Sequence, residues 1–573
     1  MERFKNFIRK YSIIDFVFIA LIIIVFSFLF SHHLSYLLMD TGRELLFPQE
    51  ILNGNLPYKD ILMIYFPTAY YINALIYKLL GVSMDSLIIS QTLLCIFYMF
   101  LYYLLARIFL SRKTSLLTTL FIISCCIFAK CDLFSFIVPY SYARVYGIIS
   151  FTLCTYLLIK LFKTDNILYL YSAALVSGLC FIFKFDFFIV YILLLAALFM
   201  YKRLKKIQYL KVFLLSLVFP SLLLLFLLIQ GVGINDMLAA AEFGCKFSGT
   251  TVMKKFLSHT GLYPFDIVEK FKLMAQYVSC LVSVILLIFA AYKMEIKYRK
   301  VWILPLFVTI IWILFGTLPF WINYCWLCIP YIILFVLCFK FKELFRENKP
   351  FLLVIIASLL CAQRDFFHHA LSEYGTYSFP LTFLVLCIIV KKYLPEVISG
   401  VKKEKITNLT IVILISISFI ILCEKNINTT WPIRSEKGTI YTDIKNYYLF
   451  SQIMYYINSN VDKNESLLVL QEGHMVNWLT DRKINLKCHM MDRLYHDAFG
   501  DEEAKNQIAS ANYDYIIVIE KMGHAKFFGP FLYYKGNSLV QEYIEDNYKP
   551  VKEIDDGKAF GKALIYKKVN QIS

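Results

Sequence analysis

The sequence contains few charged side chains: only 17% of its 573 residues are Asp, Glu, Lys or Arg, whereas 59% are hydrophobic. Soluble domains carry roughly 25% charged residues, so the composition excludes a soluble globular protein. Acidic residues are also scarce, with 41 Asp and Glu against 58 Lys and Arg, a formal net charge of +17. The Lys and Arg residues form short clusters between apolar runs. This is the pattern of cytoplasmic loops in membrane proteins, so we expect no nucleic-acid partner.

Three further features are missing. The last quarter of the chain has only one of the 15 cysteines, Cys488, which excludes a disulfide framework there. Cys325 and Cys328 have metal-site spacing but stand in an apolar run without further ligands nearby, so we interpret them as core residues. No small-residue cleavage site follows the first apolar run, so we expect a retained first helix. A Gly-rich phosphate loop is also missing, which leaves nucleotide binding without support.

Long apolar runs predict a polytopic α-helical membrane protein with roughly thirteen transmembrane helices. The basic clusters between the runs place the N-terminus in the cytoplasm and the C-terminus outside, because positive residues favour the cytoplasmic side. We therefore expect a multi-pass membrane protein. The predicted spans are approximately 13–30, 85–109, 116–129, 142–161, 168–183, 187–200, 212–230, 272–292, 301–320, 322–340, 350–363, 377–394 and 407–423, with a loop at 231–270.

The composition changes abruptly after about residue 424. We predict a transmembrane domain at 1–424 and a soluble extracytoplasmic α/β domain at 425–573, which is a normal domain size. His474 and Trp478 in this domain are candidate acceptor contacts. Short apolar runs predict strands, and amphipathic patterns predict helices; the strands are expected at 467–470, 515–519 and 563–566, and the helices at 441–458 and 502–511.

Chemistry is concentrated in the first outer loop, 33–84, directly after the first apolar run. Three ionisable residues follow that run directly and should lie at the membrane surface: Asp40, Arg43 and Glu44. Ionisable groups next to a membrane span indicate a functional role. The turn cluster 53–57 contains Gly, Asn and Pro. It predicts a short interfacial helix over 41–52, with Asp60 and Pro67 opening a second helix.

This loop resembles the first outer loop of polyprenyl-phosphate-sugar-dependent glycosyltransferases of the C-type superfold. The resemblance is greatest to the bacterial branch similar to protein O-mannosyltransferases and lipid A aminoarabinose transferases. It implies that Asp40 is the catalytic acidic residue. Thr41 follows Asp40, where relatives often have Glu, and Glu44 comes three residues later. The residues that carry the resemblance are Asp40, Gly42, Arg43, Gln49, Ile51, Asn53, Gly54, Pro57, Tyr58, Asp60, Pro67 and Tyr70.

A sugar transferase that faces outward needs a lipid-anchored sugar donor, because nucleotide sugars are absent outside a bacterial inner membrane. A carboxylate base must take a proton from the acceptor, and cations must stabilise the departing phosphate. Asp40 fits the first role, and Arg43, three residues on, could keep Asp40 ionised. The alternative is an interfacial salt bridge without catalysis.

The predicted donor-phosphate cations lie at outer helix ends. Basic residues there can instead simply extend toward lipid headgroups, and the histidines can cap or pack. A divalent cation that joins Asp40, Glu44 and one histidine is possible, but spacing alone does not establish a metal site. The phosphate-binding candidates are Arg43, Arg144, Lys184, Arg364 and His368, and further possible site residues are Glu44, Asp60, Tyr140, Asp186, Asp365 and His369.

The predicted function is an inverting membrane glycosyltransferase with Asp40 as general base. The expected partners are a polyprenyl-phosphate-linked sugar, membrane lipid, and an envelope glycan, lipid or protein acceptor. One alternative is a transporter or flippase of a lipid-linked saccharide, although such proteins tend to place charges at mid-membrane and to contain internal repeats. Another is a non-catalytic assembly subunit. The sequence does not identify the sugar or the acceptor.

Overall fold

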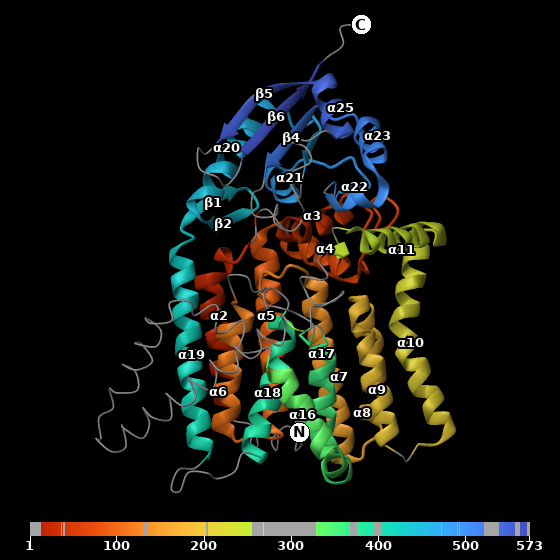
Figure 1. Cartoon of the computed structure of the whole chain (residues 1–573), viewed down its shortest axis with the longest axis vertical. Coiled ribbons are helices and arrows are strands. Elements are labelled where there is room, and N and C mark those ends of the chain that lie inside the picture. The colour runs from red at the N-terminus through yellow and green to blue at the C-terminus, as the bar shows by residue number, and fades with distance from the viewer. Residues whose placement is uncertain are drawn as a thin grey trace, which may run out of the picture.

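The structure is a computed structural model, and its helices and strands are shown in Figure 1. It describes residues 13–35, 37, 40–129, 135–201, 204–251, 253–254, 268, 328–363, 365–366, 375–393, 403–470, 473–489, 491, 493–520, 538–555 and 562–569.

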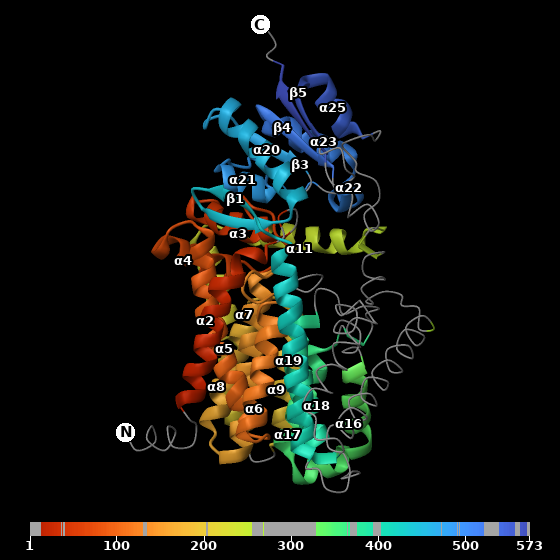
Figure 2. The ribbon, with the colours of Figure 1, turned by 90° about the vertical axis from the view of Figure 1, so that its left-hand side faces the viewer.

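A bundle of helices forms the lower part of the molecule (Figures 1 and 2). Among the described residues, six helices are long and apolar enough to cross a membrane: α2, α5, α7, α10, α18 and α19. The chain is therefore a multi-pass membrane protein. The helices of the bundle are α2 (Ile13–Phe30), α5 (Met84–Arg107), α6 (Arg112–Ile122), α7 (Tyr142–Thr164), α8 (Leu168–Phe181), α9 (Ile189–Met200), α10 (Lys206–Ile229), α16 (Cys328–Glu347), α17 (Lys349–Cys361), α18 (Gly375–Tyr393) and α19 (Lys403–Ile427).

Helices occupy most of the predicted spans, since apolar length is a strong signal for this element. The predicted spans 272–292 and 301–320 lie outside the described residues. The loop predicted at 231–270 is wrong in part, because α11 (Ile234–Gly249) is a helix. Gly231, with φ of +88°, ends the turn after α10, and Gly233 is the N-cap of α11. These glycines mark the boundary of a helix, not the start of an extended loop.

Three helices lie between the bundle and the C-terminal region: α3 (Asp40–Leu52), α4 (Thr68–Leu80) and α11 (Figures 1 and 2). The prediction of a helix over 41–52 is confirmed. Pro67 is the N-cap of α4 as expected, whereas Asp60 belongs to the preceding turn. A buried apolar cluster holds α3 against the loop 56–64 and the α10–α11 junction; its members include Phe47, Ile61, Tyr70, Leu227 and Ala240.

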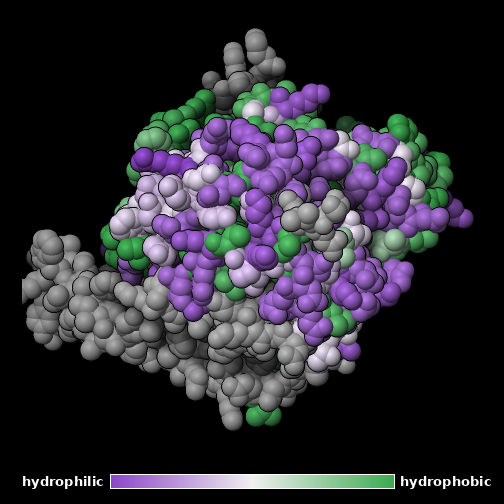
Figure 3. All heavy atoms as spheres, turned by 90° about the horizontal axis from the view of Figure 1, so that it is seen from above, coloured by the Kyte–Doolittle hydropathy of each residue, from purple (hydrophilic) through white to green (hydrophobic). Residues whose placement is uncertain are grey.

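The C-terminal α/β region contains a four-stranded sheet of order β3-β4-β6-β5, in which only β3 and β4 are parallel. Viewed from above, this region presents a largely hydrophilic surface (Figure 3). Its elements are β1 (Trp431–Ser435), β2 (Gly438–Thr442), α20 (Ile444–Asn460), β3 (Leu467–Leu470), α21 (His474–Thr480), α22 (Arg493–Phe499), α23 (Asp501–Ala511), β4 (Tyr515–Glu520), α25 (Leu539–Asn547), β5 (Tyr548–Asp555) and β6 (Lys562–Lys568).

The predicted strands correspond to β3, β4 and β6, whose apolar side chains are mostly buried. The sequence did not predict β5. This edge strand is mostly exposed and contains Lys549, Lys552 and Glu553. Charged side chains are typical of edge strands, where they oppose pairing with other chains.

Candidate active site

The first turn of α3 carries three ionisable side chains at the end of the bundle nearest the C-terminal region. Asp40 is the first residue of the helix, and its carboxylate Oδ1 lies 2.6 Å from Nη1 of Arg43. An i,i+3 spacing places the two side chains on one helical face. The Asp40 side chain is 24% exposed, whereas that of Arg43 is 8% exposed. The carboxylate is therefore held by a buried cation and remains open to solvent.

Glu44 is buried, with a side chain that is 1% exposed, and it accepts hydrogen bonds from three residues. Its Oε1 accepts hydrogen bonds from Arg43 Nε and Nη2, both at 3.2 Å, and from Tyr70 Oη at 2.8 Å. Its Oε2 accepts the backbone N–H of Tyr142 at 2.9 Å. Burial raises the pKa of Glu44, while Arg43 and the Tyr142 N–H oppose this effect. Glu44 thus joins α3 to α4 and to the first turn of α7.

Tyr140 connects Arg43 to a second buried cation, Lys184. Arg43 Nη2 donates to the Tyr140 carbonyl oxygen at 3.0 Å, and Lys184 Nζ donates to the Tyr140 hydroxyl at 3.0 Å. Both cations also face the ring of Tyr65, with Lys184 Nζ at 4.6 Å and Arg43 Cζ at 5.6 Å from its centroid. Burial alone would lower the pKa of Arg43. The nearby Asp40 carboxylate opposes this effect, and the pKa of Arg43 lies well above its ordinary value.

Arg144 on α7 is the third buried cation. Its Nη1 lies 3.2 Å from Oδ2 of Asp186, in the turn that follows Lys184. Its guanidinium lies 5.2 Å from the ring centroid of Phe187 and 5.9 Å from that of Tyr377. The Nε atom of Arg144 is buried and has no hydrogen-bond partner within the described part of the chain. Buried N–H groups are rarely left without an acceptor, so this donor is available to a ligand.

The structure thus brings together six of the predicted residues from four segments: Asp40, Arg43, Glu44, Tyr140, Arg144 and Lys184, with Asp186 at the edge. Asp365 is adjacent. It accepts a 2.5 Å hydrogen bond from Ser378, which follows Tyr377 on α18. Arg364, His368 and His369 lie outside the described residues.

Asp60 is not part of this cluster. Its carboxylate accepts the backbone N–H of Leu56 at 2.8 Å and closes the turn before the strand-like segment 61–63. The prediction that Asp60 opens the next helix is wrong, because an Asp side chain can cap its own local turn instead.

Three tyrosines of the cluster, Tyr65, Tyr70 and Tyr377, were not among the predicted site residues. In the structure Tyr70 donates to Glu44, Tyr65 faces two cations, and Tyr377 lies beside Arg144. Their sequence signal is weak, because the chain contains 41 tyrosines.

His474 and Trp478 belong to α21 of the C-terminal region and are buried, with exposed fractions of 3% and 0%. The expectation that they contact an acceptor is therefore wrong for this structure. His474 packs against Phe47 of α3, with ring centroids 5.9 Å apart. Polar side chains with an apolar body often contribute to packing in this way.

The described residues do not form a cation site. Among them, no group of three or more His, Cys, Asp or Glu side chains could hold a metal ion. Both carboxylate oxygens of Glu44 are already occupied by hydrogen-bond donors, and Asp40 is paired with Arg43. These two carboxylates therefore do not fit the ligand set that the sequence suggested.

Comparison with known proteins finds similarity in structure alone: no family model and no curated protein matches the sequence. ArnT from Cupriavidus metallidurans, bound to undecaprenyl phosphate, aligns over 98% of this chain and 98% of its own, with a TM-score of 0.52 and 10% identity. The Archaeoglobus fulgidus oligosaccharyltransferase complex with Zn and sulfate aligns over 97% of this chain and 73% of its own, with a TM-score of 0.50 and 10% identity. The chain therefore shares the overall fold of these two solved structures.

Proposed function

We propose that this protein is a membrane glycosyltransferase that moves a sugar from a polyprenyl-phosphate-linked donor to a hydroxyl or amine of an envelope glycan, lipid or protein. Transfer takes place on the outer face of the bacterial inner membrane. The observation that carries the proposal is the arrangement of a solvent-accessible carboxylate, Asp40, beside a group of buried cations in a C-type fold. ArnT, which has the same fold, binds undecaprenyl phosphate.

Asp40 acts as the general base in this proposal. Its carboxylate takes the proton of the acceptor O–H or N–H while the acceptor oxygen or nitrogen forms a bond to the anomeric carbon. The bond between that carbon and the phosphate oxygen breaks, and its electron pair leaves with the phosphate. Attack from the side opposite the phosphate inverts the anomeric configuration. The ion pair with Arg43 keeps Asp40 ionised and ready to accept the proton.

Arg144 and Lys184 bind the donor phosphate. Both are buried, and the unpartnered Nε of Arg144 supplies a donor for a phosphate oxygen. Negative charge grows on that phosphate as the sugar departs, and fixed cations in a buried site stabilise it. Arg364 and His368, which lie outside the described residues, remain predicted contributors.

The sequence predicted Arg43 as a phosphate-binding residue, whereas the proposal assigns it a positioning role. Its guanidinium already contacts Asp40, Glu44 and the Tyr140 carbonyl. Because these partners use most of its N–H groups, we assign Arg43 to holding Asp40. These contacts use four of the five N–H groups, so a phosphate contact through two N–H groups of Arg43 would require one of these bonds to break.

The test measures release of polyprenyl phosphate from a panel of radiolabelled polyprenyl phosphate sugars by purified wild type, Asp40→Asn and Asp60→Asn. Asp60 is the matched control, since it is a carboxylate of the same loop outside the cluster. We expect Asp40→Asn to lower release by roughly 100-fold or more, the scale of general-base catalysis, and Asp60→Asn to leave it unchanged. Equal release by the two variants would remove Asp40 from its role. No release by wild type would favour the transporter or the assembly subunit instead.

A further inference from the structure

Helix α21 of the C-terminal region lies alongside α3, the helix that carries Asp40. At one end, Gly42 approaches the α21 backbone so closely that a Cβ atom there would lie 2.4 Å from the Met475 nitrogen. At the other end, Gln49 Nε2 donates to Oδ1 of Asp481 at 2.8 Å. Asp481 is the C-cap residue of α21. Gly42 and Gln49 are seven residues apart, which places them on one face of α3. The two helices therefore run side by side in the same direction.

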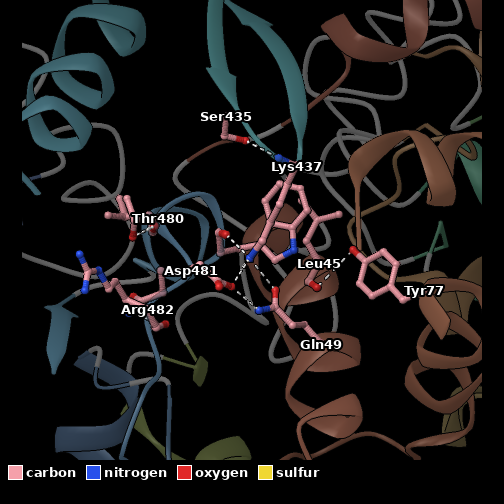
Figure 4. A network of polar contacts seen from close by, with 11 residues as sticks. Leu45, Gln49, Tyr77, Ser435, Lys437, Thr480, Asp481 and Arg482 are labelled. Carbon is pink, nitrogen blue, oxygen red and sulfur yellow. Dashed lines mark hydrogen bonds and ion pairs between the residues drawn. The ribbon is translucent and has the colours of Figure 1, made fainter. Parts of the chain in front are cut away.

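Lys437 closes the far end of this contact. It stands in the turn between β1 and β2, and its ammonium donates to Gln49 Oε1 at 2.9 Å, to the Trp478 carbonyl at 2.7 Å and to Asp481 Oδ1 at 2.7 Å (Figure 4). An ammonium has three N–H groups, and these three acceptors use all of them. The Lys437 side chain is only 12% exposed, so these bonds are largely shielded from water.

The turn that carries Lys437 is itself fixed to the membrane bundle. The backbone N–H of Met84, the first residue of α5, donates to the Lys437 carbonyl at 2.9 Å. The next residue, Gly438, has φ of +123° and lies against Met84. Only glycine adopts such a conformation readily. Lys437 thus links α5, α3 and α21 through one short turn.

The opposite side of α3 faces the candidate site. Arg43 and Glu44 contact Tyr140, Tyr142 and Tyr70, which belong to the bundle side. Lys184 and Arg144 are carried by other segments, where they contact Tyr140 and Asp186. A shift of α3 would therefore change the position of Asp40 relative to these two cations.

We propose that the C-terminal α/β region is a clamp for the catalytic helix, and that Lys437 is a positioning residue that sets the place of Asp40 by joining Gln49 to α21. This inference rests on the proposed transfer reaction. The clamp separates two functions: the bundle binds the sugar donor, and the outer region fixes the base against it. Misplacement of a reacting group by about 1 Å can lower a rate by roughly 100-fold, so the clamp affects turnover far more than donor binding.

The experiment compares full-length wild type with Lys437→Met, Asp481→Asn and Lys505→Met. Lys437→Met keeps the length of the side chain and removes its three N–H donors. Asp481→Asn retains an acceptor oxygen for Lys437 and suits the left-handed backbone at this position (φ +57°). Lys505→Met is the matched control, because Lys505 is a partly exposed lysine of α23 that pairs with Glu502 three residues earlier. Each protein is tested for turnover, for affinity for the polyprenyl phosphate sugar, and for hydrogen exchange of amides 40–52.

Lys437→Met is expected to lower kcat by about 10- to 100-fold with donor affinity within about twofold of wild type, and to speed exchange over 40–52 but not over 142–164. Lys505→Met should resemble wild type in all three measurements. Asp481→Asn keeps the acceptor oxygen but loses the charge that pairs with Lys437, so it should lower turnover less than Lys437→Met does. Unchanged turnover and exchange in Lys437→Met would overturn the clamp, and so would an equal loss of donor affinity. If wild type lacks turnover, the proposed reaction fails, while exchange over 40–52 still decides whether Lys437 holds α3.

Discussion

Removal of the Glu44 carboxylate is expected to destabilise the protein more than any other single change at the site. Glu44 is 1% exposed and accepts four hydrogen bonds, from Arg43, Tyr70 and the backbone of Tyr142. Loss of one partner of a buried ion pair costs roughly 3–5 kcal/mol, and each donor left without an acceptor adds about 1–3 kcal/mol. These terms overlap, so we expect Glu44→Ala to cost on the order of 5 kcal/mol.

Glu44→Gln separates charge from shape at the same position. Its carbonyl oxygen can still accept from Tyr70 and Arg43, but its NH₂ group meets the Tyr142 N–H, donor against donor. We expect a smaller cost, about 2–3 kcal/mol. A suitable control is Glu242→Ala, because Glu242 is 65% exposed and pairs with Lys246 on the surface of α11, where such pairs contribute little.

The assay is thermal unfolding of the detergent-purified proteins, followed by tryptophan fluorescence and by recovery of the monodisperse peak after heating. A cost on the order of 5 kcal/mol is a large share of the roughly 5–15 kcal/mol that holds a typical fold. Glu44→Ala should therefore unfold at a much lower temperature than wild type, with Glu44→Gln between them. The reasoning is refuted if Glu44→Ala and Glu242→Ala unfold at the same temperature.

Three further results are expected. Arg144→Met should weaken donor binding by 10-fold or more, because it removes the buried Nε donor and one phosphate charge; an unchanged donor Kd would argue against this phosphate site. Acidification should destabilise the contact between the C-terminal region and α3, where the ring centroids of His489 and Phe47 lie 5.3 Å apart. Burial lowers the pKa of His489 from 6.5 to about 4, so this histidine stays neutral when folded but binds a proton when unfolded, and stability present above pH 6.5 is lost as pH falls toward 4. The loss is about 3 kcal/mol at pH 4, measured as a falling unfolding temperature that His489→Phe should flatten. Gly42→Ala should lower turnover in the same way as Lys437→Met, since its Cβ would displace α3 from the α21 backbone; normal turnover would show that the contact tolerates movement.

The sequence predicts the bundle well because membrane helices have a strong signal. Each apolar run must satisfy its own backbone hydrogen bonds in lipid, so its length alone identifies a helix. α3 was also predictable, since Asn53, Gly54 and Pro57 mark its end. α11 was missed because the two glycines that precede it, Gly231 and Gly233, were interpreted as part of a loop.

The site could be predicted only in part. Position at an outer helix end identified Arg144 and Lys184, because the topology places such ends on one face. It did not show that Tyr140 bridges Lys184 and Arg43, through its hydroxyl and its carbonyl. Nor did it show that Glu44 is fully buried, which depends on the packing of three separate helices. Contacts between distant segments, such as Lys437 with Gln49, leave no local pattern in the chain.

The most direct measurement is the single-turnover rate of sugar transfer from a bound, radiolabelled polyprenyl phosphate sugar in Asp40→Asn and wild type, at saturating acceptor. Donor affinity is measured on the same samples. If Asp40 is the base, the transfer rate falls by about 100-fold or more, while the donor Kd stays within about twofold because Arg144 and Lys184 are intact. A variant that transfers sugar at the wild-type rate would contradict the central claim.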